Sequence, residues 1–110
     1  MADIIVGKGT QVQVVISMTP ITGQDGNEYS LNNLTWHVVF TGNTGSVTIQ
    51  KADAKIIDND NYEVLVNTEL TGVSEDLTWR LYVDDIPTAT SPTGARKEVT
   101  PEQFSNIEVV

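Results

Sequence analysis

The side chains that could do chemistry are few and widely spaced in this 110-residue sequence. His37 is the only histidine, and it lies in an alternating stretch with no serine or aspartate at a catalytic spacing. The Gly-x-Ser-x-Gly motif, which holds a nucleophilic serine on a sharp turn, does not occur. We therefore predict that the protein is not an enzyme and that His37 lies on the surface.

Two adjacent carboxylates, Asp84 and Asp85, could in principle act as an acid and a base. They end an alternating stretch just before Ile86 and Pro87. Neighbouring residues of a strand point to opposite faces, so the pair is not oriented for joint catalysis. We predict that the two aspartates mark the exit from a strand into a loop.

The segment from Asp58 to Tyr62 begins like a calcium-binding loop, with Glu69 at the twelfth position. Glu63 stands at the sixth position, where the calcium loop needs glycine, and an alternating strand runs directly onward. The sequence therefore predicts a turn in which an aspartate side chain bonds its own backbone. We predict no metal ion and no cofactor.

The charge balance argues against several kinds of partner. Six basic and fifteen acidic side chains give a net charge of −9, which would repel a nucleic acid backbone. No run of eighteen apolar residues and no basic start before an apolar stretch occurs, so neither membrane insertion nor a secretion signal is expected. The sequence has no cysteine, which excludes disulfides and thiolate metal sites.

Hydrophobic side chains recur at every second position, which is the period of a half-buried β-strand. This alternation is seen in residues 11–18, 34–41, 47–49, 62–67 and 77–84. The residues predicted to face the core are Val12, Val14, Ile16, Met18, Leu34, Trp36, Val38, Phe40, Val47, Ile49, Tyr62, Val64, Val66, Leu77, Trp79, Leu81 and Val83. We predict an all-β fold, an antiparallel sandwich of six to eight short strands, in a single domain over residues 1–110.

Turn residues divide these stretches. Gly42 to Gly45 predicts a tight hairpin, and residues 51–57 are expected to cross between the sheets. The sequence Thr100-Pro-Glu-Gln103 matches a helix-capping pattern with proline at the first helical position. It predicts one helical turn before a last apolar stretch.

The two tryptophans, Trp36 and Trp79, allow two interpretations. Their register with the apolar positions of their strands favours a place in the core. Alternatively, exposed tryptophan rings could stack on sugar rings, and the protein would then be a carbohydrate-binding module for host-surface glycans. The exposure of the two rings distinguishes these interpretations.

Three segments of the sequence resemble a known family. They are D-N-D-N-Y-E-V-L-V-N-T from Asp58, L-T-W-R-L-Y-V-D-D-I-P from Leu77, and G-A-R-K-E-V from Gly94. Together they resemble the immunoglobulin-like module of phage baseplate, tail and fibre-anchoring proteins, notably of gut-bacterial phages. The resemblance implies an immunoglobulin-like sandwich, and a non-enzymatic structural protein of the virion that docks or anchors other subunits in the tail, baseplate, head fibre or capsid decoration.

Both ends of the chain could serve as assembly arms that add a strand to a neighbour's sheet. Residues 1–10 hold a short apolar run flanked by glycines, and residues 104–110 end in a second apolar run. Each could instead pair within its own domain. Arg96 and Lys97 form the only adjacent basic pair, which could pair with Glu98 or meet an acidic partner. The predicted partner-binding residues are Ile4, Ile5, Val6, Arg96, Lys97, Ile107, Val109 and Val110. The expected partners are other virion proteins and further copies of the chain, in a virion assembled in the host cytoplasm.

Overall fold

Strands dominate the computed structural model, which describes residues 3–88 and 96–110. In chain order, the elements are β1 (Ile4–Val6), β2 (Gln11–Ser17), β3 (Ile21–Thr22), β4 (Glu28–Tyr29), β5 (Thr35–Thr41), β6 (Ser46–Gln50), the 3₁₀ turn η1 (Lys51–Asp53), β7 (Lys55–Asp58), β8 (Asn61–Asn67), α1 (Thr68–Thr71), β9 (Thr78–Ile86), β10 (Arg96–Val99), β11 (Gln103–Phe104) and β12 (Ile107–Val109). Among these twelve strands, the seven with four or more residues agree with the six to eight predicted; the other five have two or three residues.

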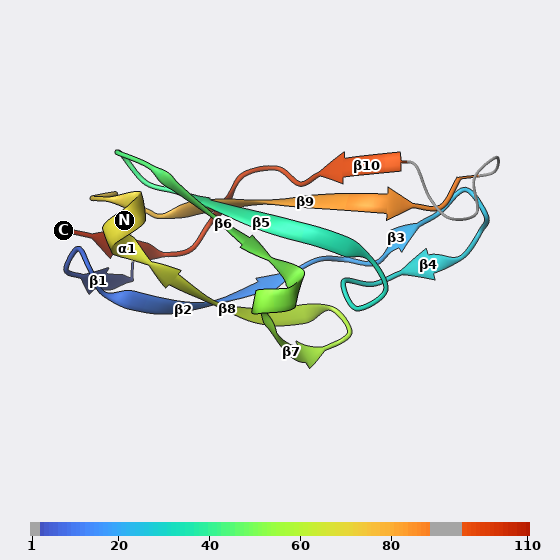
Figure 1. Cartoon of the computed structure of the whole chain (residues 1–110), viewed down its shortest axis with the longest axis horizontal. Helices are drawn as coiled ribbons and strands as arrows, with labels where there is room; N and C mark the ends of the chain where they lie inside the picture. The colour runs from blue at the N-terminus through green and yellow to red at the C-terminus, as the bar shows by residue number, and fades with distance from the viewer. Residues whose placement is uncertain (1–2, 89–95) are drawn as a thin grey trace.

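Two antiparallel sheets form the body of the protein (Figure 1). One sheet has the strand order β10-β9-β5-β6, with β11 pairing with the start of β9. The other has the order β2-β8-β7. Their apolar faces meet, so the predicted β-sandwich is confirmed. The molecule is elongated, measuring 48 × 25 × 24 Å along its principal axes.

The core lies between the sheets and follows the predicted alternation. In β2, β5, β8 and β9, every second side chain is buried, whereas the residues between them are exposed or half-buried. Of the seventeen residues predicted to face the core, fifteen are buried, and Met18 and Val47 pack against the others while partly exposed. Leu31, Ile86, Ile107 and Val109 complete the buried apolar set. The alternation of apolar residues therefore predicted correctly which face of each strand is buried.

The structure also confirms two predicted connections, the hairpin at Gly42 to Gly45 and the crossover at residues 51–57. Thr41 pairs with Ser46, and the Gly42 N–H donates to the Gly45 carbonyl oxygen at 3.0 Å, which closes the β5–β6 hairpin. After β6 the chain passes through η1 into β7, which belongs to the other sheet. The 51–57 segment thus crosses between the layers, as expected.

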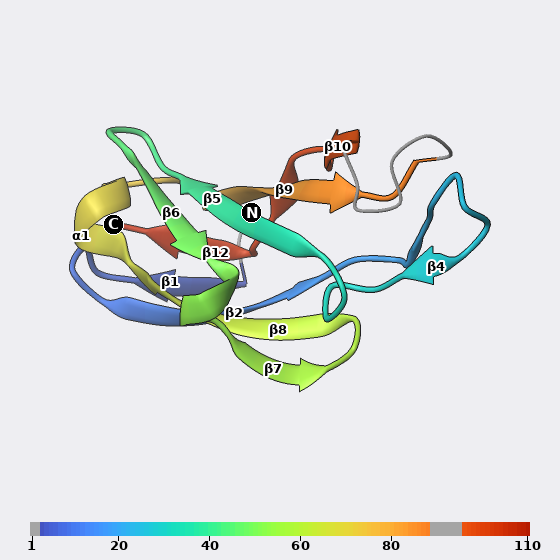
Figure 2. The ribbon, with the colours of Figure 1, turned by 45° about the vertical axis from the view of Figure 1, so that its right-hand side comes forward.

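Two smaller sheets lie at opposite ends of the long axis (Figures 1 and 2). At one end, β1 and β12 pair in parallel, which joins the first and last strands of the chain. At the other end, β3 and β4 form a short hairpin around Gly23 to Asn27. There the Asp25 carboxylate accepts hydrogen bonds from the Asn27 N–H and the Tyr29 hydroxyl. These hydrogen bonds lower the pKa of Asp25.

The prediction of a helical turn at residues 100–103 is wrong. Gln103 and Phe104 instead form β11, which pairs with Trp79 and Thr78 at the start of β9. The Thr100 hydroxyl accepts a hydrogen bond from the Leu81 N–H at 3.0 Å, rather than capping a helix. The α-helix among the described residues is α1, where the Asn67 side chain accepts from the Glu69 N–H at 3.0 Å.

Candidate interaction surfaces

The two chain ends, predicted as separate arms, lie together in one parallel ladder. Ile4 pairs with Ile107, Ile5 with Glu108, and Val6 with Val109. The Ile4 N–H donates to the Asn106 carbonyl oxygen at 3.1 Å, and the Val110 N–H donates to the Val6 carbonyl oxygen at 2.9 Å. On its other side, β12 bonds to the segment before β9: the Leu77 N–H donates to the Ile107 carbonyl oxygen at 2.8 Å. Strand β12 is therefore paired along both of its edges.

A buried threonine fixes the turn that joins β1 to β2. Thr68 is fully buried, and its hydroxyl donates to the Thr10 carbonyl oxygen at 2.7 Å. The same oxygen atom of Thr68 accepts from the Gly9 N–H at 2.9 Å, and the Thr68 N–H adds a bond to Thr10 at 3.2 Å. The start of the chain is thus tied to its own domain rather than free to leave it.

Burial divides the predicted partner-binding residues of the chain ends. Ile107 and Val109 are 4% and 0% exposed and belong to the core, so their prediction as partner contacts is wrong. Both alternate inward from β12, as core residues of any strand do. Val6 is half-buried and packs against the core. Ile4, Ile5 and Val110 remain 53%, 64% and 58% exposed, so three apolar side chains stay accessible at this end of the molecule.

The predicted basic pair, Arg96 and Lys97, lies on β10 and is not part of the β1–β12 ladder. The Arg96 guanidinium contacts the Glu98 carboxylate at 3.2 Å, which confirms the predicted pairing with an acidic neighbour. The Lys97 ammonium lies 3.3 Å from the Asp84 carboxylate of β9. Both pairs are partly exposed to water, so each contributes at most about 1 kcal/mol. The remaining residues of that motif, Gly94 and Ala95, lie outside the described residues.

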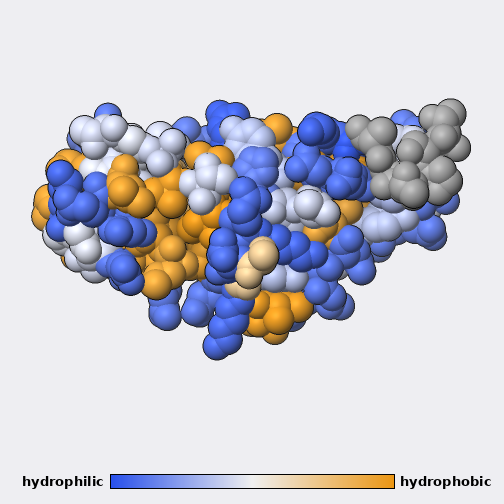
Figure 3. All heavy atoms as spheres, in the orientation of Figure 1, coloured by the Kyte–Doolittle hydropathy of each residue, from blue (hydrophilic) through white to orange (hydrophobic). Residues whose placement is uncertain are grey.

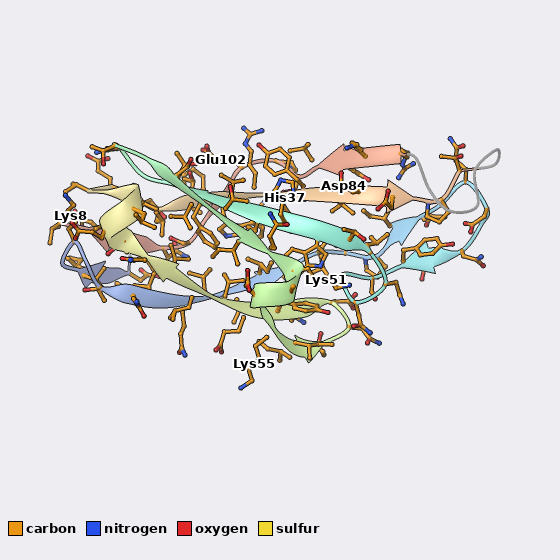
Figure 4. The ribbon with its side chains drawn as sticks, in the orientation of Figure 1. Lys8, His37, Lys51, Lys55, Asp84 and Glu102 are labelled. Carbon is orange, nitrogen blue, oxygen red and sulfur yellow. The ribbon has the colours of Figure 1, made fainter. Side chains whose placement is uncertain are left out.

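His37 lies on the outer face of β5, half-buried, where its ring stacks on the Tyr82 ring of β9. The ring centroids are 5.0 Å apart and the planes differ by 2°. Within the described residues no serine or aspartate side chain bonds to it. Figure 4 shows His37 and Asp84 on neighbouring strands of the same sheet. The aromatic contact gives His37 a packing role on this face.

The two acidic motifs have structural roles. Asp58 accepts hydrogen bonds from the Asp60 N–H at 2.9 Å and from the Asn61 side chain at 2.8 Å, which confirms the predicted aspartate turn between β7 and β8. These bonds lower the pKa of Asp58. Asp85 has a φ of +58°, and the pairing of β9 with β10 shifts register at this point. The aspartate pair therefore forms a bulge at the end of β9.

Both tryptophans are core residues, since Trp36 is 1% and Trp79 is 8% exposed. The Trp36 indole N–H donates to the Leu31 carbonyl oxygen at 3.0 Å, and its ring meets Tyr62 edge-on with centroids 5.1 Å apart. Core packing is confirmed for both residues. The alternative of a sugar-stacking platform built from these two rings is wrong.

Two open depressions flank the sandwich. One, of about 600 Å³, lies between the segment after β2 and strands β10 and β11, and Met18, Trp79 and Arg96 help to line it. The other, of about 520 Å³, lies between η1 and β7, lined by Trp36, Ile56 and other residues. Each exposes part of the core edge between the two sheets.

Lys51 borders the second depression and was not singled out by the sequence. Its ammonium donates to the carbonyl oxygens of Asn32 at 2.9 Å and Leu34 at 2.7 Å. Partial burial lowers the pKa of Lys51. Figure 4 shows its place at the crossover, whereas Lys55 points away from the sandwich. Lys51 therefore ties the crossover to the turn before β5.

In the part of the chain that the structure describes, no group of three or more histidine, aspartate or glutamate side chains is arranged to hold a metal ion. No described helix is long and apolar enough to cross a membrane. The comparisons with known proteins gave no match to a family model, to a curated protein or to a solved structure.

Proposed function

We propose that this chain is a non-enzymatic, immunoglobulin-like docking module of a virion, placed in the tail, baseplate, head fibre or capsid decoration. The virion part of the proposal rests on the resemblance of the segments starting at Asp58, Leu77 and Gly94. The strand order supports the immunoglobulin-like part: β7-β8-β2 faces β6-β5-β9, with two long strands at the centre of the larger sheet.

One observation carries the docking role. The large apolar side chains that stay exposed lie on strand faces, on strand edges and at one end of the molecule, and do not line a closed pocket. The set consists of Ile4, Ile5, Val15, Ile56, Ile57, Leu65, Leu70, Val73, Val99, Phe104 and Val110. Where such side chains lie close together, as Ile4, Ile5 and Val110 do at the terminal ladder, exposed apolar surface is typical of protein–protein contacts. A small-molecule enzyme would instead concentrate apolar and titratable groups in a cleft.

The terminal ladder is the docking surface that we propose for other virion subunits. Its outer strand, β1, is paired with β12 and with no other described strand, and Ile5 lies at its centre with 64% of its surface exposed. The Ile4 and Val6 backbones bond to β12, so the Ile5 backbone faces away from β12. A partner strand can add there without displacing Ile107 or Val109 from the core. Docking thus uses the folded end of the domain.

The virion role is tested on particles of the phage that encodes the chain. We expect the chain to co-sediment with infectious particles through a density gradient and to be detected there by mass spectrometry. Particles that contain no trace of it would remove the virion role.

The docking surface is tested separately by cross-linking. Because the chain has no cysteine, a photoreactive maleimide can be placed at one chosen position. We expect an Ile5→Cys chain incorporated into particles to cross-link to an identified virion protein. The matched control is Thr22→Cys, an exposed strand position at the opposite end of the long axis. Equal cross-linking from both positions, or none from Ile5→Cys, would contradict this surface.

A further inference from the structure

The sheet-terminal strands differ in how their free edges are protected. Four strands end the two main sheets, namely β2, β6, β7 and β10. Natural proteins protect such edges with charges, bulges or prolines, because a bare edge pairs with another chain. Strand β10 has three charged residues out of four and a register shift, and β7 has two charged residues and a register shift. Both edges are therefore protected.

The other two terminal strands carry no charge, no proline and no register shift. Of these, β2 already buries all three of its inward-facing apolar side chains, Val12, Val14 and Ile16. Strand β6, with the sequence Ser-Val-Thr-Ile-Gln, has a sheet partner only in β5 among the described strands, and its inward-facing Val47 stays partly exposed. Strand β6 is therefore the uncharged edge that still leaves inward-facing apolar surface open to water.

The register of the hairpin shows which groups of β6 point outward. The Gly42 N–H bonds to the Gly45 carbonyl oxygen, and hydrogen-bonded pairs recur at every second residue of an antiparallel ladder. Val47 and Ile49 therefore direct their backbone groups to β5. The N–H and C=O groups of Ser46, Thr48 and Gln50 point away from it, into the free edge.

We propose that β6 pairs with β6 of a second copy of this chain, antiparallel across a two-fold axis at Thr48. This is the one register in which all three outward-facing residues meet outward-facing partners. Thr48 lies opposite its own counterpart, and Ser46 lies opposite Gln50 of the other copy. The pairing joins the two larger sheets into one continuous sheet, an isologous contact that closes at two copies.

The side chains agree with this register. Ser46, Thr48 and Gln50 meet each other on the outer face, so uncharged polar groups face uncharged polar groups. On the inner face, Val47 meets Ile49 of the other copy. Val47 is still partly exposed, although it packs against the core. The contact would cover apolar surface that the single chain leaves open to water.

The absence of charge on β6 allows a second copy to pair with this edge. The chain carries a net charge of −9, so two copies repel each other wherever acidic surfaces meet. Strand β6 brings no charge to the seam, whereas pairing through β7 or β10 would bring charged side chains together. Figure 3 shows hydrophobic colour gathered between the two sheets on the side where β6 lies in Figure 1. Close to the start of β6, Leu70 of α1 is another exposed apolar side chain, with 59% of its surface open to water.

Sedimentation velocity over a range of protein concentrations tests the proposal. We expect the mass of the unmodified chain to rise from 12.0 kDa towards twice that value. Thr48→Lys places two ammonium groups opposite each other across the axis, and we expect it to stay at 12.0 kDa. Gln13→Lys is the matched control, because Gln13 is an exposed, outward-facing residue of the other uncharged edge strand, and it should dimerise like the unmodified chain. Circular dichroism should show the same fold for all three proteins.

A disulfide test fixes the register. Residues opposite each other in a hydrogen-bonded antiparallel pair have Cα atoms about 5.5 Å apart, within the range of about 4.4–6.8 Å that a disulfide spans. We expect Thr48→Cys to form a covalent dimer under mild oxidation and Gln13→Cys to remain a monomer. The proposal is overturned if the unmodified chain stays monomeric up to about 1 mM, the weak end of measurable affinity. It is also overturned if Thr48→Lys dimerises like the unmodified chain, or if Gln13→Lys loses the dimer as fully as Thr48→Lys. This inference does not depend on the virion role.

Discussion

Strands β12 and β6 are both short, peripheral and alternating, yet they differ in what surrounds them. Strand β12 is bonded on one side to β1 and on the other to the segment before β9, and its two apolar side chains are buried. Strand β6 is bonded on one side only, and of its apolar residues Ile49 is buried and Val47 is partly exposed. A peripheral strand therefore buries its apolar side chains fully when its second edge finds a partner in the same chain, and less fully when that edge stays unpaired.

Removing β12 is the test of this contrast with the largest expected effect on stability. Deleting residues 107–110 takes away two buried side chains and both ladders of the strand. We expect a loss of more than about 5 kcal/mol of folding free energy, comparable with the whole stability of many small domains. Chemical denaturation followed by tryptophan fluorescence measures it. Val110→Ala, an exposed position, is the control and should change stability by less than about 0.5 kcal/mol. A deletion variant that unfolds cooperatively at the same denaturant concentration would contradict the contrast.

A matched pair of valines measures the same contrast at single side chains. Val109 of β12 is fully buried, whereas Val47 of β6 is partly exposed. We expect Val109→Ala to lower the free energy of unfolding by about 2–3 kcal/mol, because it removes buried methyl groups and leaves a cavity. Val47→Ala should cost less than about 1 kcal/mol in the monomer. Equal losses in urea denaturation would show that the two strands are equally part of the core.

A pair of threonines extends the test to hydrogen bonds. The buried Thr68 hydroxyl bonds to Gly9 and Thr10, so Thr68→Val leaves the Gly9 N–H without its partner. We expect a loss of about 1–3 kcal/mol in the free energy of unfolding. Thr48→Val, on the free edge of β6, should change it by less than about 0.5 kcal/mol in dilute solution. If Thr68→Val is neutral, the turn before β2 does not depend on this hydroxyl.

The smallest expected effect concerns pH at the aspartate turn next to the protected edge of β7. Hydrogen bonds lower the pKa of Asp58 below its ordinary value of 3.8, so the folded state favours the carboxylate. The stabilisation is complete above the unfolded pKa and is lost as pH falls through the folded pKa. We expect the melting temperature to fall with pH below about 3.8, and to fall less in Asp58→Asn. Identical pH profiles for the two proteins would rule out this contribution.

The sequence alone predicted the layers of this fold because alternation is a local signal. The faces of β2, β5, β8 and β9 can be assigned from consecutive residues, and so can the hairpin at Gly42 to Gly45. The capping pattern at Thr100 was misleading, because pairing with β9 outweighed a weak helical preference. A single helical turn fixes too few residues to compete with a sheet partner.

The interaction surfaces were harder to predict because they depend on pairing between distant segments. Nothing near Ile107 in the sequence indicates that β1 and the residues before β9 enclose β12. For the same reason, Ile5 and Val110 could be identified as apolar but not as neighbours of one ladder. Lys51 gave no local signal either, since its partners are carbonyl oxygens of the 32–34 segment.

The parallel ladder at the chain ends has a consequence for how the protein folds. Ile4 and Ile107 are 103 positions apart (107 − 4), so their contact closes nearly the entire chain into a loop. Contacts of such long range form slowly, because the loop entropy is lost before the contact gives anything in return. During synthesis, β1 must wait until the ribosome has released β12. Until that moment the inner edge of β1 is unpaired and open to wrong partners, so the emergence of β12 from the ribosome determines when this edge is closed.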